Sequence, residues 1–81
     1  DKDFQKELQK QKKRLQTLEL DINNTKVQKE NIEQELGNPD TYTNPAKFAA
    51  LETEYKSVQQ KLATLNSEYE TVFEKVLEME S

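Results

Sequence analysis

The chain has 81 residues, of which 32% are hydrophobic and 35% are charged. A single core of this size contributes little net stability, and so polar a composition suits long solvated helices better than a compact globule or a sheet. The sequence contains no Cys and no His, so it lacks disulfides, thiolate metal ligands and the commonest general base. It also shows no phosphate-binding loop and no nucleophile beside a base. We therefore expect no catalytic site, no metal site and no enzyme in this chain.

The net charge of −4 is unevenly distributed along the chain. Residues 1–36 carry eight basic and eight acidic groups, whereas residues 37–81 carry four and eight. A uniformly basic surface is therefore excluded. We find neither an apolar run long enough to span a membrane nor a leader of the signal-peptide type. These features predict a cytoplasmic protein without a membrane partner.

Residues 4–36 are predicted to form the first long helix. Seam residues recur there at alternating intervals of three and four, which places them on one stripe of a helix. The seam positions are Phe4, Leu8, Gln11, Leu15, Leu18, Ile22, Thr25, Lys29, Ile32 and Leu36. Gly37 can close this helix in the left-handed conformation, and Pro39 cannot continue it.

Residues 37–44 are predicted to form the connecting loop, in which Asn38 and Pro39 can open a single helical turn. Asn44 is a suitable N-cap and Pro45 a suitable first residue for a second helix over residues 45–80. This helix repeats the same spacing. Its seam positions are Phe48, Leu51, Tyr55, Val58, Leu62, Leu65, Tyr69, Val72, Val76 and Met79.

The two seams predict an all-α fold in which two long helices form an antiparallel coiled-coil hairpin. The whole of residues 1–81 is expected to be one domain and a monomer in isolation, because each seam is covered by the other. The layers run from Phe4 with Val76 at the open end to Ile32 with Phe48 near the turn. Tyr69 then faces Gln11, and similarly placed Tyr55 faces Thr25, where each phenol can meet a polar side chain.

Charge selects the register of this hairpin. In the favoured register, oppositely charged residues face one another along the flanks of the seam, whereas the neighbouring registers bring like charges together. The expected pairs are Glu7 with Lys75, Arg14 with Glu68, Asp21 with Lys61, Glu35 with Lys47, and Lys26 with Glu52. Exposed pairs contribute only about 0 to 1 kcal/mol each. They therefore choose the register, and the apolar layers hold the hairpin together.

One cluster of basic residues is a candidate binding site. It consists of Lys6, Lys10, Lys12, Lys13 and Arg14, interrupted only by Glu7. Lys6, Lys10 and Lys13 fall on the outer positions of the helix and form one stripe. Such a stripe can be a nucleic-acid contact, but a run of charges is more often simply a solvated helix face. Both interpretations remain open from the residues alone.

Four further apolar residues lie outside the seams, namely Leu20, Val27, Phe73 and Leu77. They predict a surface that docks a protein partner, or they are the scattered apolar residues that ordinary surfaces carry. The alternative function is therefore a purely structural coiled-coil arm that spaces domains or docks a protein through these outer apolar residues.

The strings ELGNPDTYTNPAKFAALETEY at residues 35–55 and EYETVFEKVLEME at residues 68–80 carry a resemblance to a known family. They resemble the C-terminal coiled-coil domain of Uup-type ABC-F ATPases, in which a turn of the form L-x-D/N-P-x-x-Y precedes a helix ending in a YERWLELE-like string. The chain departs from that ending with Phe73 for Tyr, Lys75 for Arg and Val76 for Trp.

This resemblance implies that the chain is the tail of a soluble protein with two ATP-binding cassettes that acts on ribosomes or DNA. It implies that ATP is the cofactor of the parent protein and that this fragment, which has no Walker motif, does not hydrolyse it. The tail of such a protein is expected to bind nucleic acid, above all DNA, weakly and without sequence preference. RNA or the ribosome is the other expected partner.

Overall fold

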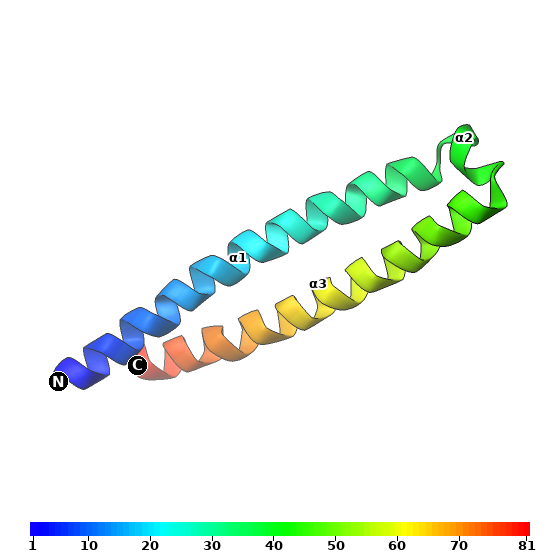
Figure 1. Cartoon of the computed structure of the whole chain (residues 1–81). Coiled ribbons are helices and arrows are strands. Elements are labelled where there is room, and N and C mark those ends of the chain that lie inside the picture. Colours follow the sequence, from blue (N-terminus) through cyan, green and yellow to red (C-terminus); the bar gives the residue numbers. More distant parts are fainter.

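The computed structural model describes residues 1–81 and consists of three helices without strands. Helix α1 spans Lys2–Leu36, the short helix α2 spans Pro39–Tyr42, and helix α3 spans Pro45–Glu80. The two long helices run antiparallel, with α2 at the tip and both termini at the open end (Figure 1). The molecule is a rod whose Cα extents are 62 × 16 × 14 Å. The predicted antiparallel helical hairpin is therefore confirmed.

The ends of α1 are set by local hydrogen bonds. The Asp1 carboxylate accepts the N–H of Asp3, so the helix begins before the first seam residue. Gly37 ends α1 with φ −84° and ψ −3°, and the expectation of a left-handed glycine is wrong. The Gly37 N–H donates to the carbonyls of Glu33 and Gln34 in a right-handed last turn. The extended backbone of Asn38, and not a left-handed residue, then redirects the chain.

Side-chain hydrogen bonds fix the turn at the tip of the hairpin. The Asn38 side chain accepts the N–H of Asp40 and caps α2, as the Asn-Pro signal indicates. The Asn44 side chain accepts the N–H of Lys47 and caps α3 in the same way. Thr41 is completely buried, and its hydroxyl donates to the Glu35 carboxylate at 3.3 Å. The α2 turn is thus fixed to the end of α1.

The core is the seam between α1 and α3. Apart from Phe4, every seam position is buried or half-buried, and nearly every residue outside the seams is exposed. The buried apolar residues are Leu8, Leu18, Ile22, Ile32, Val58, Val72 and Val76. Two polar seam residues, Gln11 and Thr25, are buried with them. The heptad assignment therefore places the core correctly on both helices.

The ion pairs across the seam agree with the favoured register in part. Three of the expected pairs are formed: Arg14 with Glu68 at 3.1 Å, Glu35 with Lys47 at 3.6 Å, and Glu7 with Lys75 at 3.8 Å. Neither Asp21 with Lys61 nor Lys26 with Glu52 is among the ion pairs of the structure, so these two expectations are wrong. Two of the pairs that form lie in the half of the hairpin toward the open end, and the third lies beside the tip.

We expect the Arg14–Glu68 pair to contribute a measurable but small coupling energy of about 0.2 to 1 kcal/mol, because both side chains are about half exposed. Arg14→Glu alone should lower the free energy of unfolding slightly, and adding Glu68→Arg should restore it. A double-mutant cycle by urea denaturation measures this coupling. A cycle that closes without any coupling would contradict the assigned role of this pair in fixing the register.

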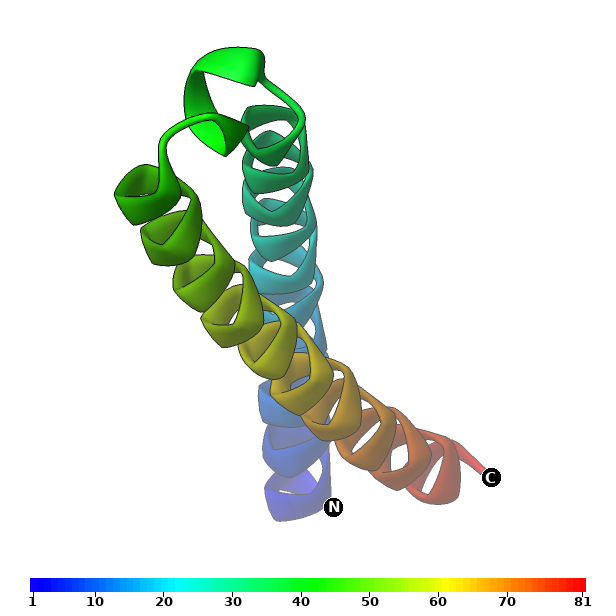
Figure 2. The same ribbon diagram turned by 90° about the vertical axis from the view of Figure 1, so that its right-hand side faces the viewer.

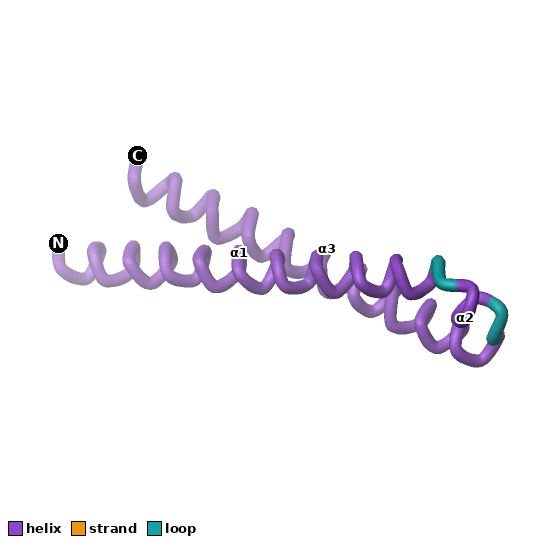
Figure 3. The backbone as a smooth tube through the Cα atoms, turned by 90° about the horizontal axis from the view of Figure 1, so that it is seen from above, coloured by secondary structure: helices purple, strands orange, loops and turns teal.

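The two helix axes are inclined and cross along the rod (Figures 2 and 3). Both views show the two chain ends apart at the open end. Phe4, in the first turn of α1, is 41% exposed. The expected closed layer of Phe4 with Val76 is therefore not formed. Val76 is buried, but the first turn of α1 extends beyond the C-terminal end of α3 and leaves Phe4 uncovered (Figures 1 and 3).

Candidate nucleic-acid interface

All five basic residues of the candidate site lie on the first turns of α1. Lys6, Lys10 and Lys13 are exposed, and none of these side chains takes part in an ion pair or hydrogen bond. The intervals of four and three place them on the side of α1 that points away from α3. We call these three residues the basic face. It presents three ammonium groups that form no ion pair within the molecule.

The other two members of the cluster have partners on α3. The Lys12 ammonium lies 3.7 Å from the Glu80 carboxylate. The Arg14 guanidinium donates to the Glu68 carboxylate at 3.1 Å. The structure thus divides the predicted site into three free lysines on the outer side and two paired residues on the flanks of the seam. Sequence reasoning missed the Lys12–Glu80 pair, since these residues do not face each other in the heptad register.

Glu7, which interrupts the basic run, is tied to its neighbours. Its carboxylate accepts a 2.7 Å hydrogen bond from the Gln11 amide and lies 3.8 Å from the Lys75 ammonium. The Gln11 hydrogen bond, with the charges of Lys10 and Lys75, lowers the pKa of Glu7. The carboxylate therefore stays ionised in mildly acidic solution, and Lys75 on the other helix balances its charge. The sequence predicts Tyr69 as the polar partner of Gln11. The structure shows Glu7 in that role.

Two phenol–carboxylate hydrogen bonds cross the opposite flank of the seam. Tyr69 donates to Glu19 at 3.1 Å, and Tyr55 donates to Glu33 at 2.9 Å. The expected partner of Tyr55 was Thr25, whose hydroxyl instead donates to the Asp21 carbonyl of its own helix. Side chains lean toward the N-terminus of their own helix. In an antiparallel pair, tyrosines of α3 and glutamates of α1 therefore lean toward each other.

These hydrogen bonds raise the pKa of both Tyr55 and Tyr69, chiefly because each phenol donates to a carboxylate. A raised pKa means that the stabilisation is fully present below the ordinary tyrosine pKa of 10.0 and is lost as the pH rises through the higher folded value. We therefore expect Tyr69→Phe to have a smaller alkaline loss of thermal stability than the native chain.

Thermal melts between pH 8 and pH 11 measure this difference, and comparison with the native chain removes the shared effect of lysine deprotonation. A double variant with Tyr55→Phe should show a still smaller loss. Identical pH profiles for all three proteins would contradict the proposed contribution of the two hydrogen bonds.

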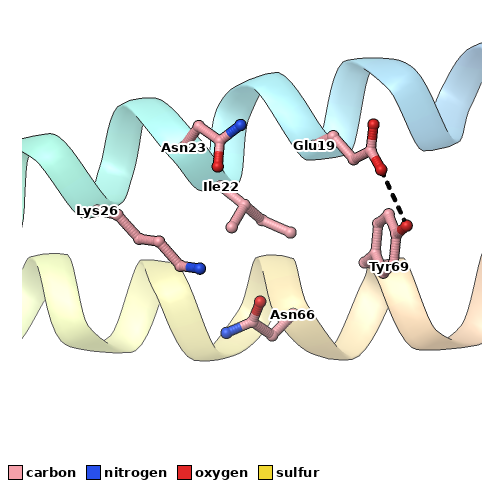
Figure 4. A pocket seen from close by; sticks show the side chains of 6 residues that line it. All are labelled: Glu19, Ile22, Asn23, Lys26, Asn66 and Tyr69. Atoms are coloured by element: carbon pink, nitrogen blue, oxygen red, sulfur yellow. Dashed lines mark hydrogen bonds between the residues drawn. The ribbon is translucent and has the colours of Figure 1, made fainter.

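A shallow open groove of about 410 Å³ lies along this flank (Figure 4). It is lined by Glu19, Ile22, Asn23, Lys26, Asn66 and Tyr69. Figure 4 shows the Tyr69–Glu19 hydrogen bond at one end and Lys26 toward the other. The groove holds no nucleophile with a base, and no group of His, Cys, Asp or Glu side chains in the molecule is placed to hold a metal ion. Its polar groups can donate and accept hydrogen bonds.

A family model described as ABC transporter C-terminal domain matches residues 6–74. The chain belongs to this family. No curated protein and no solved structure gives a match. In this ABC transporter C-terminal domain, the matched range contains the whole tip, most of α1 and α3, and all five basic residues of the candidate site.

The surface of this ABC transporter C-terminal domain also carries exposed apolar side chains. Leu20 and Val27 project from α1, and Phe73 and Leu77 project from α3. The Phe73 ring stacks on Tyr69 with a centroid distance of 6.0 Å. Neither long helix contains a segment long and apolar enough to cross a membrane.

Proposed function

We propose that this ABC transporter C-terminal domain is an accessory module through which a larger ATPase contacts nucleic acid, and that duplex DNA is its partner. The observation that carries the proposal is the basic face, because Lys6, Lys10 and Lys13 are exposed and unpaired while most neighbouring charges are paired. Unpaired ammonium groups at helical spacing can neutralise phosphates and release their counterions. Lys12 and Arg14 are secondary contacts, since each would first have to leave its carboxylate.

The proposed parent is a Uup-type ABC-F ATPase of the cytoplasm that acts on ribosomes or DNA. Its ATP-binding cassettes would hold ATP and carry out hydrolysis, and this domain would contribute binding only. The isolated domain is proposed to be a monomer, with no membrane partner. The resemblance of the turn and the last helical turns to that family supports this finer assignment.

The proposed binding is not sequence-specific. The basic face contains only lysines, which contact phosphates as point charges and lack the planar fork with which Arg reads guanine. The exposed aromatic ring nearest to them, that of Phe4, occupies a seam position and not the outer side of α1, where it could stack on an unpaired base. We therefore expect a weak affinity in the non-specific range of roughly micromolar or weaker.

The test is a titration of a fluorescently labelled DNA duplex at low salt. We expect Lys6→Gln, Lys10→Gln and Lys13→Gln together to abolish most of the binding. The matched control is Lys26→Gln, Lys56→Gln and Lys61→Gln, which changes the net charge equally at exposed, unpaired lysines elsewhere. Equal binding by the two triple variants, or no binding by the native domain, would contradict the proposal. An RNA duplex in parallel tests which nucleic acid is preferred.

A second candidate function is a structural arm that docks a protein or spaces domains. It is favoured by the exposed apolar side chains, of which Leu20 is 61% exposed and Val27 is 55% exposed on the outer side of α1. This candidate predicts that Leu20→Ser and Val27→Ser impair the parent protein while leaving duplex binding unchanged. The opposite pattern, in which only the lysine substitutions impair the parent, favours the nucleic-acid contact.

A further inference from the structure

The charges at the open end of the hairpin are segregated onto opposite sides of the rod. On α1 the outer side there carries the basic face, with Asp3 as the one acidic residue beside it. On α3 the outer side carries Glu70, Glu74 and Glu78, which we call the acidic face. The ion pairs of Glu7 with Lys75 and of Lys12 with Glu80 place these two faces in the same part of the rod, at its open end.

The ion pairs of the structure create this segregation. At the open end, the carboxylates of Glu7, Glu68 and Glu80 are all paired with basic side chains across the seam. All three members of the acidic face are exposed and have no ion pair. The charges left over are therefore positive on the outer side of α1 and negative on the outer side of α3.

We infer that the domain binds a duplex from one side only, with the outer side of α1 against the phosphates and the outer side of α3 turned away. This inference rests on the proposed function and adds the orientation of the bound hairpin. Lys6 to Lys13 extend over about 10 Å of helix, a length that covers about three phosphates of one strand along the duplex axis. A duplex on the α3 side would meet three uncompensated carboxylates, which repel its phosphates.

Distance and salt decide how strongly the acidic face affects binding on the other side. Two packed helices separate the charged groups of the two faces by about 20 Å. The Debye length is about 8 Å at 0.15 M salt and about 30 Å at 0.01 M salt. The acidic face should therefore weaken binding to the α1 side only at low salt, while it prevents binding to the α3 side under all conditions.

The chain has no Cys, so a single introduced cysteine is the only thiol, and its rate of alkylation measures the accessibility of that one position. Thr17→Cys and Thr71→Cys form a matched pair, since both residues are exposed and each hydroxyl bonds the carbonyl four residues earlier, at 3.2 Å and 3.1 Å. Thr17 follows the basic face by one turn, and Thr71 lies within the acidic face. The rate of alkylation by uncharged iodoacetamide is measured with and without excess DNA duplex at low salt.

We expect the duplex to slow alkylation at position 17 several-fold and to leave position 71 unchanged. Equal slowing at both positions, while the duplex is bound, would overturn the orientation and leave the proposed function intact. No binding of the duplex by either variant would overturn both the orientation and the proposed function.

A second measurement removes the charges of the acidic face. Glu70→Gln, Glu74→Gln and Glu78→Gln together should raise the affinity for the duplex several-fold near 0.01 M salt and have no effect near 0.15 M salt. A loss of affinity in this variant would show that the acidic face itself contacts the partner, and would contradict the inference.

Discussion

Leu18→Ala is expected to lower the free energy of unfolding by about 2 to 5 kcal/mol. Leu18 is only 3% exposed and packs in one cluster with Leu8, Val72 and Val76. A two-helix hairpin has few other residues that can move to fill the space left by the missing side chain. Since small domains have total stabilities of about 5 to 15 kcal/mol, the variant should be partly or completely unfolded at physiological temperature.

Urea denaturation followed by circular dichroism measures this loss. Leu20→Ala is the matched control, because it removes the same atoms from the same helix at a side chain that is 61% exposed. Its effect should stay within about 0.5 kcal/mol. Leu62, the expected layer partner of Leu18, is only half-buried, so Leu62→Ala should cost less than Leu18→Ala. Equal losses for Leu18→Ala and Leu20→Ala would contradict the assignment of the core.

A tenfold rise in salt concentration is expected to weaken duplex binding by the native domain about 500-fold. Three phosphate contacts from Lys6, Lys10 and Lys13 give a log-log slope of about −2.7, because each contact releases nearly one condensed counterion. Arg14 is held by Glu68 at 3.1 Å, so we do not include it among the contacts. The slope of log affinity against log salt concentration gives the number of phosphate contacts, which a single affinity measurement does not.

Fluorescence anisotropy with a labelled duplex, from about 10 to 100 mM salt, gives the slope directly. Lys13→Gln alone should make it shallower by about 0.9, which corresponds to one lost contact. Lys61→Gln, at an exposed lysine of α3, should leave it unchanged. A native slope near zero would exclude the basic face as a phosphate contact and favour the structural arm.

The sequence by itself determined the helices, the seam and three of the five expected ion pairs across it. A spacing of three and four residues places side chains on one stripe wherever the backbone is helical, so the buried positions follow from Leu8 to Met79 without knowledge of the fold. Asn38 and Asn44 cap their helices through hydrogen bonds that are local in the chain. The Arg14–Glu68 pair followed from matching charges along two straight seams.

The sequence predicts which residues make up the candidate site, but not which of them are paired in the folded chain. The sequence places Lys6, Lys10 and Lys13 on one side of a helix, but it could not show that Lys12 reaches Glu80. That contact depends on the crossing of the axes and on the direction in which long side chains lean. The acidic face is also present in the sequence. Only the structure shows that its carboxylates are unpaired while the other carboxylates at the open end form ion pairs.

The tertiary structure decided the contacts that depend on three-dimensional geometry. Tyr69 reaches Glu19 because antiparallel side chains lean toward one another, so the residue directly opposite is not the partner. Phe4 is left partly uncovered because the first turn of α1 extends beyond the C-terminal end of α3. Thr41 is buried because α2 folds against both α1 and α3, a packing that no periodicity records. Periodicity describes a straight helix, whereas these positions depend on how two helices cross and end.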